Sequence, residues 1–128
     1  MARILVIEDD FRVRTVIRKM LEKEKHEVVE APNGEAGMNL YREKSADLII
    51  TDILMPDKEG IETIIELRRD FPKVKIIAIS GGGRIGPGDY LSLAKKVGAT
   101  TTLLKPFSRQ ELIETVREQL SDQQDQSV

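Results

Sequence analysis

Four short apolar runs in this sequence each end on a residue that can take part in phosphate chemistry. In chain order these residues are Asp9 with Asp10, then Asp52, Ser80 and Lys105. If the four runs are neighbouring parallel strands, their carboxyl ends meet at one edge of one sheet. Three carboxylates, a hydroxyl and an ammonium at one edge are typical of a magnesium-dependent site that accepts a phosphoryl group.

The three carboxylates are the candidate metal ligands. Carboxylates crowded at one point ionise at a high cost unless a cation joins them, and Mg²⁺ commonly binds one or two carboxylates together with water and phosphate. We expect Asp10 and Asp52 to bind Mg²⁺ directly. A main-chain carbonyl near Leu54 is the expected third ligand, and Asp9 is expected to act through water. The alternative is that Asp9 and Asp10 only cap a helix that begins around Phe11.

Asp52 is the candidate nucleophile. A carboxylate takes a phosphoryl group when a metal and a cationic side chain neutralise the charge on the phosphoryl oxygens. Lys105 supplies that cation, and Ser80 offers a hydroxyl donor to a phosphoryl oxygen. Pro106 restricts the Lys105 backbone to extended geometry, and an X-Pro bond in a tight turn is compatible with a cis peptide. The alternatives are that Lys105 is a solvated surface charge and Ser80 a turn residue.

The elements that must position these residues alternate between two patterns. Segments with apolar residues at helical spacing, such as the stripes from Val13 to Leu21 and from Ile61 to Leu67, separate short β-branched runs at 3–8, 27–30, 47–51, 74–79 and 101–104. This alternation predicts an α/β fold with a doubly wound five-stranded parallel sheet, for which we expect the strand order 2-1-3-4-5. Ligands then bind between the first and third strands, which are the strands that end on the aspartates. The second strand becomes an edge strand whose end carries no reactive residue.

Length and composition limit the classes of protein that remain. A chain of 128 residues suits one domain, which we expect over residues 1–120, with 121–128 as a polar, disordered tail. The 20 basic and 22 acidic residues give no basic field for nucleic acid or an anionic membrane. Cysteine is absent, no apolar stretch is long enough for a membrane span, and the first strand begins too early for a signal peptide. We therefore expect a cytoplasmic protein.

Taken together, the strand-end motifs resemble the receiver domain of bacterial two-component response regulators. The resemblance runs from about residue 3 to residue 120 and rests on Glu8-Asp9-Asp10, the stretch 52–56, Ser80 and Lys105-Pro106-Phe107. It implies a flavodoxin-like fold, Mg²⁺ held by Asp9, Asp10 and Asp52, and phosphorylation of Asp52 by a phosphohistidine of a histidine kinase or phosphotransferase. It also implies slow self-catalysed dephosphorylation with no other enzymatic activity. Such a module signals through changed contacts with a downstream protein, here unidentified, as a monomer or weak dimer.

The sequence departs from the family pattern at three places. The aromatic residue that usually lies three positions before the lysine is replaced by Thr102. Thr100-Thr101 replaces the acidic pair, and Thr115 the arginine, that form the salt-bridged dimer of the winged-helix transcription factors, so membership of that branch is not favoured. The segment from Ser80 to Lys105 is also longer than usual, with the excess in 81–88. We therefore expect a switch that does not use an aromatic rotamer.

Three alternatives remain at the level of the sequence. The chain is compatible with the receiver of a longer regulator. A phosphatase of the haloacid dehalogenase type also uses an aspartate nucleophile with Mg²⁺, but it generally needs a carboxylate two residues later, where Leu54 lies. A flavodoxin-like nucleotide binder needs a glycine loop after the first strand, and that loop is absent.

Overall fold

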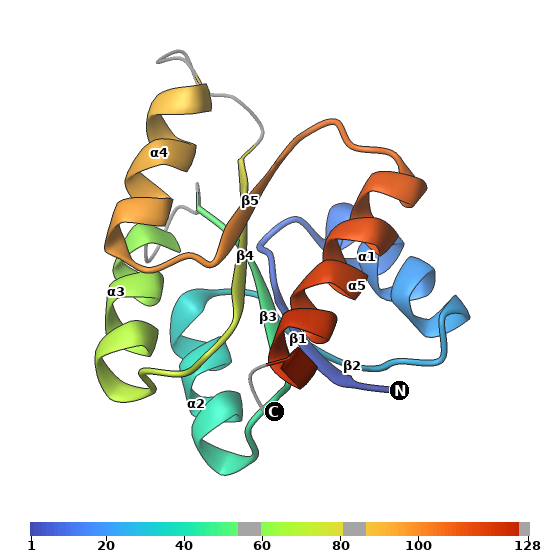
Figure 1. Ribbon diagram of the computed structural model, residues 1–128, viewed down its shortest axis with the longest axis horizontal. Coiled ribbons are helices and arrows are strands. Elements are labelled where there is room, and N and C mark those ends of the chain that lie inside the picture. The colour runs from blue at the N-terminus through green and yellow to red at the C-terminus, as the bar shows by residue number, and fades with distance from the viewer. Residues whose placement is uncertain (54–59, 81–86, 126–128) are drawn as a thin grey trace.

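The chain folds around one sheet of five parallel strands. The computed structural model describes residues 1–53, 60–80 and 87–125, and its strand order is β2-β1-β3-β4-β5 (Figure 1). The strands are β1 (Arg3–Ile7), β2 (Glu27–Ala31), β3 (Leu48–Asp52), β4 (Ile76–Ser80) and β5 (Thr101–Leu104). All neighbouring strands run parallel, so their carboxyl ends lie along one edge. The predicted α/β class and strand order are confirmed.

Helices cover both faces of this sheet. They are α1 (Phe11–Lys23), α2 (Gly34–Glu43), α3 (Gly60–Asp70), α4 (Pro87–Val97) and α5 (Arg109–Asp125). In Figure 1, α1 and α5 lie on one side of the sheet, and α2, α3 and α4 lie on the other. This arrangement follows from the chain order, because each parallel pair of strands needs a helical crossover on one face.

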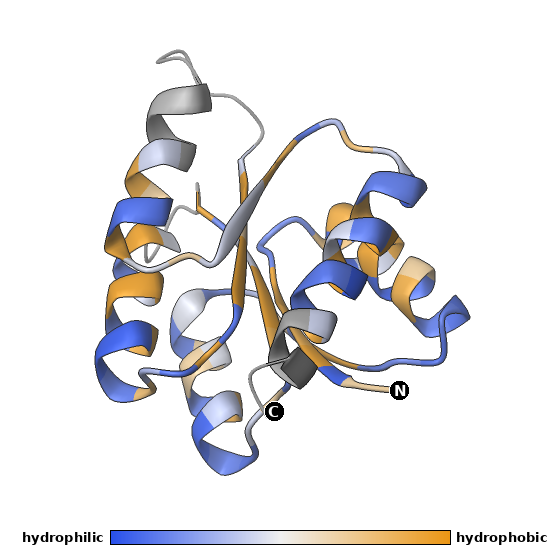
Figure 2. Ribbon diagram, viewed as in Figure 1, coloured by the Kyte–Doolittle hydropathy of each residue, from blue (hydrophilic) through white to orange (hydrophobic). Residues whose placement is uncertain are grey.

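The two faces of the sheet carry separate apolar cores. One core joins the sheet to α2, α3 and α4 and includes Ile49 and Ile64, while the other joins it to α1 and α5 and includes Ile50 and Leu112. The strands read as continuous apolar runs because both of their faces are covered. Figure 2 shows the result, with apolar strands at the centre and hydrophilic residues on the outer helix surfaces. Among the described residues, no helix has the length and apolar character that a membrane span requires.

Two predicted details differ from the structure. Val16 and Ile65 belong to the predicted apolar stripes, but their side chains remain 49% and 44% exposed. The sheet side of α1 is occupied by Ile17 and Leu21 instead, so the neighbouring Val16 faces outward. The last helix also continues through 121–125, which were expected to be a disordered tail. Glutamine propagates a helix through backbone hydrogen bonds without needing a buried face; residues 126–128 lie outside the described part.

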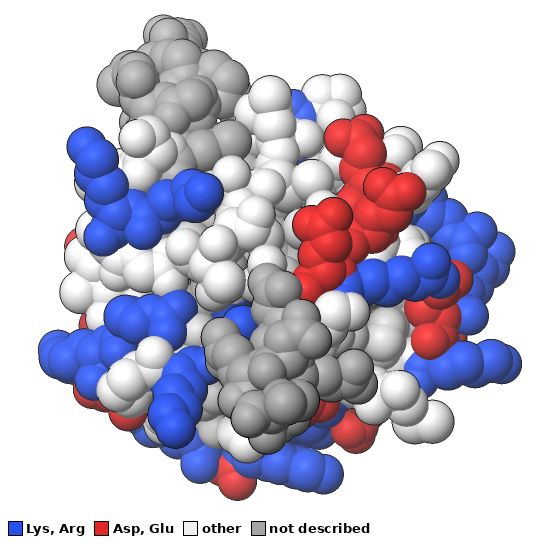
Figure 3. Space-filling model, in the orientation of Figure 1, with Lys and Arg blue, Asp and Glu red and all other residues white. Residues whose placement is uncertain are grey.

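Charged side chains on the surface are segregated by element. Figure 3 shows acidic side chains gathered over α5, where Glu111, Glu114 and Glu118 are exposed. It also shows basic side chains over α3 and α4, whose last turns carry Arg68-Arg69 and Lys95-Lys96. Cations in the last turn of a helix interact favourably with its dipole, so the basic groups have a local structural explanation.

Candidate functional site

The carboxyl edge of the sheet brings together three ionised side chains from three strand ends. Asp52 is the last residue of β3 and is 5% exposed, and Glu8 follows β1 and is 2% exposed. Lys105 follows β5, and its Nζ donates to Asp52 Oδ2 at 2.7 Å and to Glu8 Oε1 at 2.9 Å. The sequence placed Asp52 and Lys105 at one edge, and in the structure they form an ion pair in which Asp52 is buried and Lys105 is partly exposed.

A third carboxylate completes an acidic cluster. Oxygen atoms of Glu8, Asp9 and Asp52 all lie within 4.8 Å of one another. Together with Lys105, the three carboxylates leave a formal charge of −2, from three negative charges and one positive charge. Hard oxygen donors with this residual charge suit a hydrated divalent cation such as Mg²⁺.

The structure groups a different set of carboxylates from the expected one. Asp10 was expected to bind the metal directly, but it is the N-cap of α1, where its Oδ1 accepts from the main-chain N–H groups of Arg12 and Val13. Asp10 thus caps α1 as the alternative described, whereas Asp9 joins the acidic cluster. Glu8, which the sequence reasoning did not assign, takes the remaining place. An aspartate directly before the first apolar residue of a helix, here Phe11, is a helix-start pattern, and that pattern distinguishes Asp10 from Glu8.

Burial and charge shift the ionisation of this cluster. Burial raises the pKa of Glu8 to about 7; the hydrogen bond from Lys105 lowers it, and the charge of Asp52 raises it further. Burial alone would lower the pKa of Lys105, but the hydrogen bonds to Asp52 and Glu8 outweigh it and raise that pKa above its ordinary value. Lys105 therefore remains an ammonium, and Glu8 is the carboxylate whose charge is most costly in the metal-free protein.

The other predicted site residues lie at the same edge or outside the described residues. Ser80 ends β4 with its side chain buried, and its carbonyl accepts from the main-chain N–H of Lys105 at 2.8 Å. The peptide bond between Lys105 and Pro106 is cis, an isomer that the sequence allowed. Leu54, the predicted carbonyl ligand, and residues 81–86 of the glycine-rich stretch lie outside the described part of the chain.

Three of the four threonines that replace family residues, Thr100, Thr102 and Thr115, have local roles. Thr102 lies opposite Ala78 in the ladder between β4 and β5, and it is half-buried. The hydroxyl of Thr100 accepts from the main-chain N–H of Ile76 at 3.0 Å. The hydroxyl of Thr115 donates to the carbonyl of Glu111, one turn earlier in α5, at 2.7 Å. In the structure, the contacts of Thr100 and Thr115 are therefore with main-chain groups.

An apolar pocket opens beside the acidic cluster. It has a volume of about 470 Å³ and lies between α1 and the segment that follows β5, lined by Arg12, Val13, Val16, Ile17, Met20, Lys105, Pro106 and Phe107. On the same helix, Phe11 is 68% exposed. Lys105 belongs both to this pocket and to the acidic cluster, so a molecule bound in the pocket would lie next to Asp52.

Comparisons with known proteins agree with this fold. The model of the response regulator receiver domain matches residues 4–117. The chain is 37% identical to the probable C4-dicarboxylate response regulator DctR of Bacillus subtilis, covering 82% of this chain but only 46% of that protein. It is 32% identical to the chemotaxis protein CheY of the same organism, covering 93% of this chain and 98% of that one.

The solved structures give the same result. A response regulator receiver domain protein from Clostridium thermocellum is 30% identical, with a TM-score of 0.88 over 97% of this chain and 98% of that one. The chain thus spans about half the length of the first of these relatives and nearly all of the other two. It belongs to the response regulator receiver domain family of two-component systems, whose members are phosphoacceptor signalling modules.

Proposed function

We propose that this chain accepts a phosphoryl group on Asp52 with Mg²⁺ bound by the adjacent carboxylates. The observation that supports this proposal is the contact between Lys105 and Asp52 inside the cluster that also contains Glu8 and Asp9. A partly buried lysine paired with a carboxylate at a cation site supplies the charges that phosphoryl transfer requires. Asp9 and Asp52 are the proposed direct ligands, with Glu8 beside them and Leu54 contributing its main-chain carbonyl. Asp10 acts as the helix cap.

The reaction proposed for Asp52 is an in-line displacement at phosphorus. One oxygen of the carboxylate forms a bond to the phosphorus atom, while the bond from phosphorus to the imidazole nitrogen of the donor breaks. The imidazole retains that electron pair and takes up a proton. Lys105 stabilises the charge on the phosphoryl oxygens, and Ser80 donates its hydroxyl to one of them. Bound Mg²⁺ supplies further neutralisation of the same oxygens.

The experiment that tests Asp52 is intact-mass spectrometry after incubation with acetyl phosphate and Mg²⁺. The wild-type protein should gain one phosphoryl group, and it should gain none when EDTA replaces Mg²⁺. Asp52→Asn should remain unlabelled, whereas Asp10→Asn should label as the wild type does because asparagine also caps a helix. Equal labelling of Asp52→Asn and the wild type would contradict the proposed acceptor.

The phosphodonor is proposed to be a histidine kinase or phosphotransferase that docks on the pocket beside the cluster. The pocket is apolar, and Val16, one of its lining residues on α1, is 49% exposed. Contiguous exposed apolar surface beside a reactive group suits a protein partner. Val16→Asp should slow labelling by a phosphohistidine protein but leave labelling by acetyl phosphate unchanged. Loss of both reactions would show damage to the site rather than to docking.

The remaining proposals concern the setting of this module. The chain acts in the cytoplasm through changed contacts with a downstream protein, as a monomer or weak dimer, and it catalyses only its own phosphorylation and dephosphorylation. Residues 1–120 form the receiver domain. Thr102 is too small to fill and vacate a pocket as an aromatic side chain does, so the change in contacts arises without an aromatic switch at this position.

A further inference from the structure

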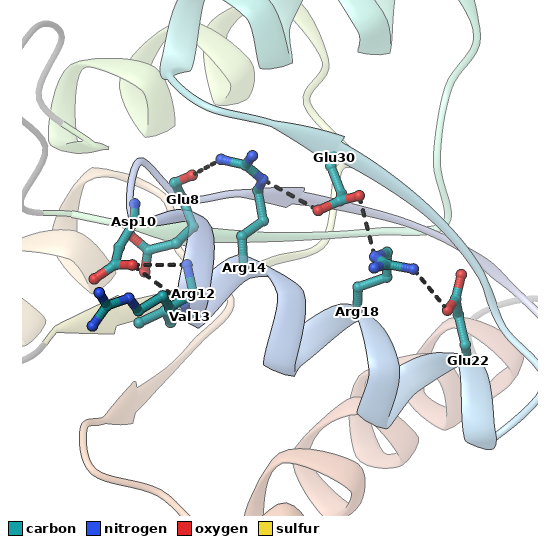
Figure 4. Close-up of polar contacts among 8 residues, drawn as sticks. All are labelled: Glu8, Asp10, Arg12, Val13, Arg14, Arg18, Glu22 and Glu30. Carbon is teal, nitrogen blue, oxygen red and sulfur yellow. Dashed lines mark hydrogen bonds and ion pairs between the residues drawn. The ribbon is translucent and has the colours of Figure 1, made fainter.

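Both main-chain polar groups of Glu8 are tied to residues outside the acidic cluster. Its N–H donates to the carbonyl of Ala31, at the end of β2, at 3.0 Å. Its carbonyl accepts from Nη1 of Arg14, in the second turn of α1, at 2.8 Å (Figure 4). These two contacts fix the plane of the peptide groups on either side of Glu8, and they therefore fix the direction in which its side chain leaves the backbone.

The same arginine closes a ring through the start of α1. The carboxylate of Glu8 accepts from the N–H of Asp10 at 3.2 Å, and the carbonyl of Asp10 accepts from the N–H of Arg14 at 2.9 Å. Arg14 then returns to the carbonyl of Glu8. The turn that carries Glu8 and Asp9 is thus held at both ends, at one by the helix cap and at the other by the guanidinium.

A carboxylate of the edge strand orients this guanidinium. Glu30 of β2 accepts from Nε of Arg14 at 3.2 Å, and the side chain of Arg14 is only 14% exposed. Figure 4 shows Glu30 between Arg14 and Arg18, which forms a further ion pair with it at 3.2 Å. The fork of an arginine reaches a carbonyl and a carboxylate at the same time, which the single ammonium of a lysine does less well. The edge strand therefore contributes to the site through Glu30, although its end carries no reactive residue.

We propose that Arg14 is a positioning residue for the cation site and that Glu30 sets the orientation of Arg14. This role rests on the proposed function, because it requires that Glu8 and Asp9 help to bind a divalent cation. A simple charge effect predicts the opposite result. A positive charge beside the cluster repels a cation, so removal of that charge alone would tighten cation binding. Removal of a positioning contact would weaken it, so the sign of the change separates the two roles.

The test is the affinity of the protein for Mn²⁺, measured by electron paramagnetic resonance of the free ion. Arg14→Gln should bind Mn²⁺ about tenfold more weakly than the wild type, a typical effect of removing a group that orients a metal ligand. Arg18→Gln is the matched control: it removes a similar charge and an ion pair to Glu30 but leaves the carbonyl of Glu8 bound. Its affinity should equal or slightly exceed that of the wild type. Equal or tighter binding by Arg14→Gln would overturn the proposal.

Two further variants separate positioning from stability. Arg14→Lys keeps the charge and should bind Mn²⁺ with an affinity between those of Arg14→Gln and the wild type. Glu30→Gln should weaken binding in the wild-type background but not in the Arg14→Gln background, because it acts through Arg14. An equal effect of Glu30→Gln in both backgrounds would contradict its role. Thermal unfolding of each variant shows that the titrations use folded protein.

Mn²⁺ binding by the wild-type protein shows whether a negative result contradicts the cation site or only the positioning role of Arg14. A wild-type protein that binds no Mn²⁺ would contradict the cation site itself. Normal wild-type binding, together with unweakened binding by folded Arg14→Gln, would contradict only the positioning role. The amide signals of Glu8 and Asp9 in ¹H–¹⁵N spectra give a second readout, because they should move in Arg14→Gln and stay in place in Arg18→Gln.

Discussion

The body of the sheet and its carboxyl edge are buried to a similar extent but contain opposite chemistry. In the body, Ile4, Ile50 and Ile77 are 0% exposed and lie in adjacent strands. At the edge, Glu8 and Asp52 are 2% and 5% exposed, yet both carry ionisable carboxyl groups. Burial of apolar surface stabilises the fold, whereas burial of like charges destabilises it. The body therefore supplies the stability that lets the edge hold a reactive cluster.

The largest effect should come from a cavity in the body. Ile50 lies between Val6 and Ile77 in the sheet, and its side chain belongs to the core under α1 and α5. Ile50→Ala should lower the free energy of unfolding by about 4 kcal/mol, measured by urea denaturation. Ile65→Ala is the control, because Ile65 is 44% exposed and should cost less than about 1 kcal/mol. Similar losses for both variants would show that the structure misassigns the core.

At the edge, removal of a charge should raise the free energy of unfolding rather than lower it. The pKa of Glu8 is raised from 4.5 to about 7, so the folded protein binds more protons than the unfolded chain between these values. The free energy of unfolding contributed by this group therefore falls as pH rises through that window. In EDTA, the difference between pH 5 and pH 8 should be about 2 to 3 kcal/mol.

The variant Glu8→Gln isolates this contribution. It should remove the decrease in stability between pH 5 and pH 8, and it should be more stable than the wild type at pH 8 without cations. The comparison must be between the two proteins, because His26 has a lowered pKa and contributes stability that rises with pH. A Glu8→Gln variant that keeps the wild-type pH dependence would show that Glu8 is not the costly carboxylate.

Two helical glycines, one at the edge and one against the body of the sheet, differ in what an added side chain would contact. A Cβ on Gly60 would meet the carbonyl oxygen of Asp52 and the Cα of Ile53, which are backbone atoms. A Cβ on Gly37 would meet Cδ1 of Ile7, the movable end of a side chain. Gly60→Ala should therefore lower the free energy of unfolding by about 2 kcal/mol. It should also weaken Mn²⁺ binding, because Asp52 must move.

The change at Gly37 is the control for helix propensity. Alanine gains up to about 1 kcal/mol over glycine within a helix, which offsets the displacement of Ile7. Gly37→Ala should therefore stay within about 1 kcal/mol of the wild type and leave Mn²⁺ binding unchanged. If Gly60→Ala binds Mn²⁺ as the wild type does, the close packing of α3 against Asp52 has no influence on the site.

The sequence predicted the body of the sheet better than its edge, for a physical reason. Apolar runs such as Leu48–Asp52 are continuous because both faces of the sheet are covered, so these runs identify the strands. The expected order 2-1-3-4-5 is one of the common orders of doubly wound sheets. Val16 and Ile65 were placed on apolar stripes, but both lie at the margin of their stripe and remain exposed. A stripe predicts which side of a helix is buried, but not how far the burial extends.

At the edge, the sequence placed Asp52 and Lys105 together, but it assigned as a direct ligand Asp10, which the structure uses as the N-cap of α1, and it did not assign Glu8. Glu8, Asp9 and Asp10 are consecutive, and near the end of a strand neighbouring side chains point in different directions. Residue types alone did not say whether α1 would use Asp10 as its cap. The guanidinium of Arg14 on the carbonyl of Glu8 is a contact that no spacing rule predicts.

The smallest expected effect tests whether Asp9 or Asp10 binds the metal. Mg²⁺ at ten times its dissociation constant should raise the free energy of unfolding of the wild type by about 1.4 kcal/mol, since it binds only the folded site. Asp9→Asn should lose most of this increase, because the cluster loses one carboxylate. Asp10→Asn should keep it, because its amide oxygen still caps α1. The increase should also be larger at pH 8 than at pH 5, where protons on Glu8 compete with the cation. Loss of the increase in Asp10→Asn, with retention in Asp9→Asn, would restore Asp10 as the metal ligand and leave Asp9 outside the site.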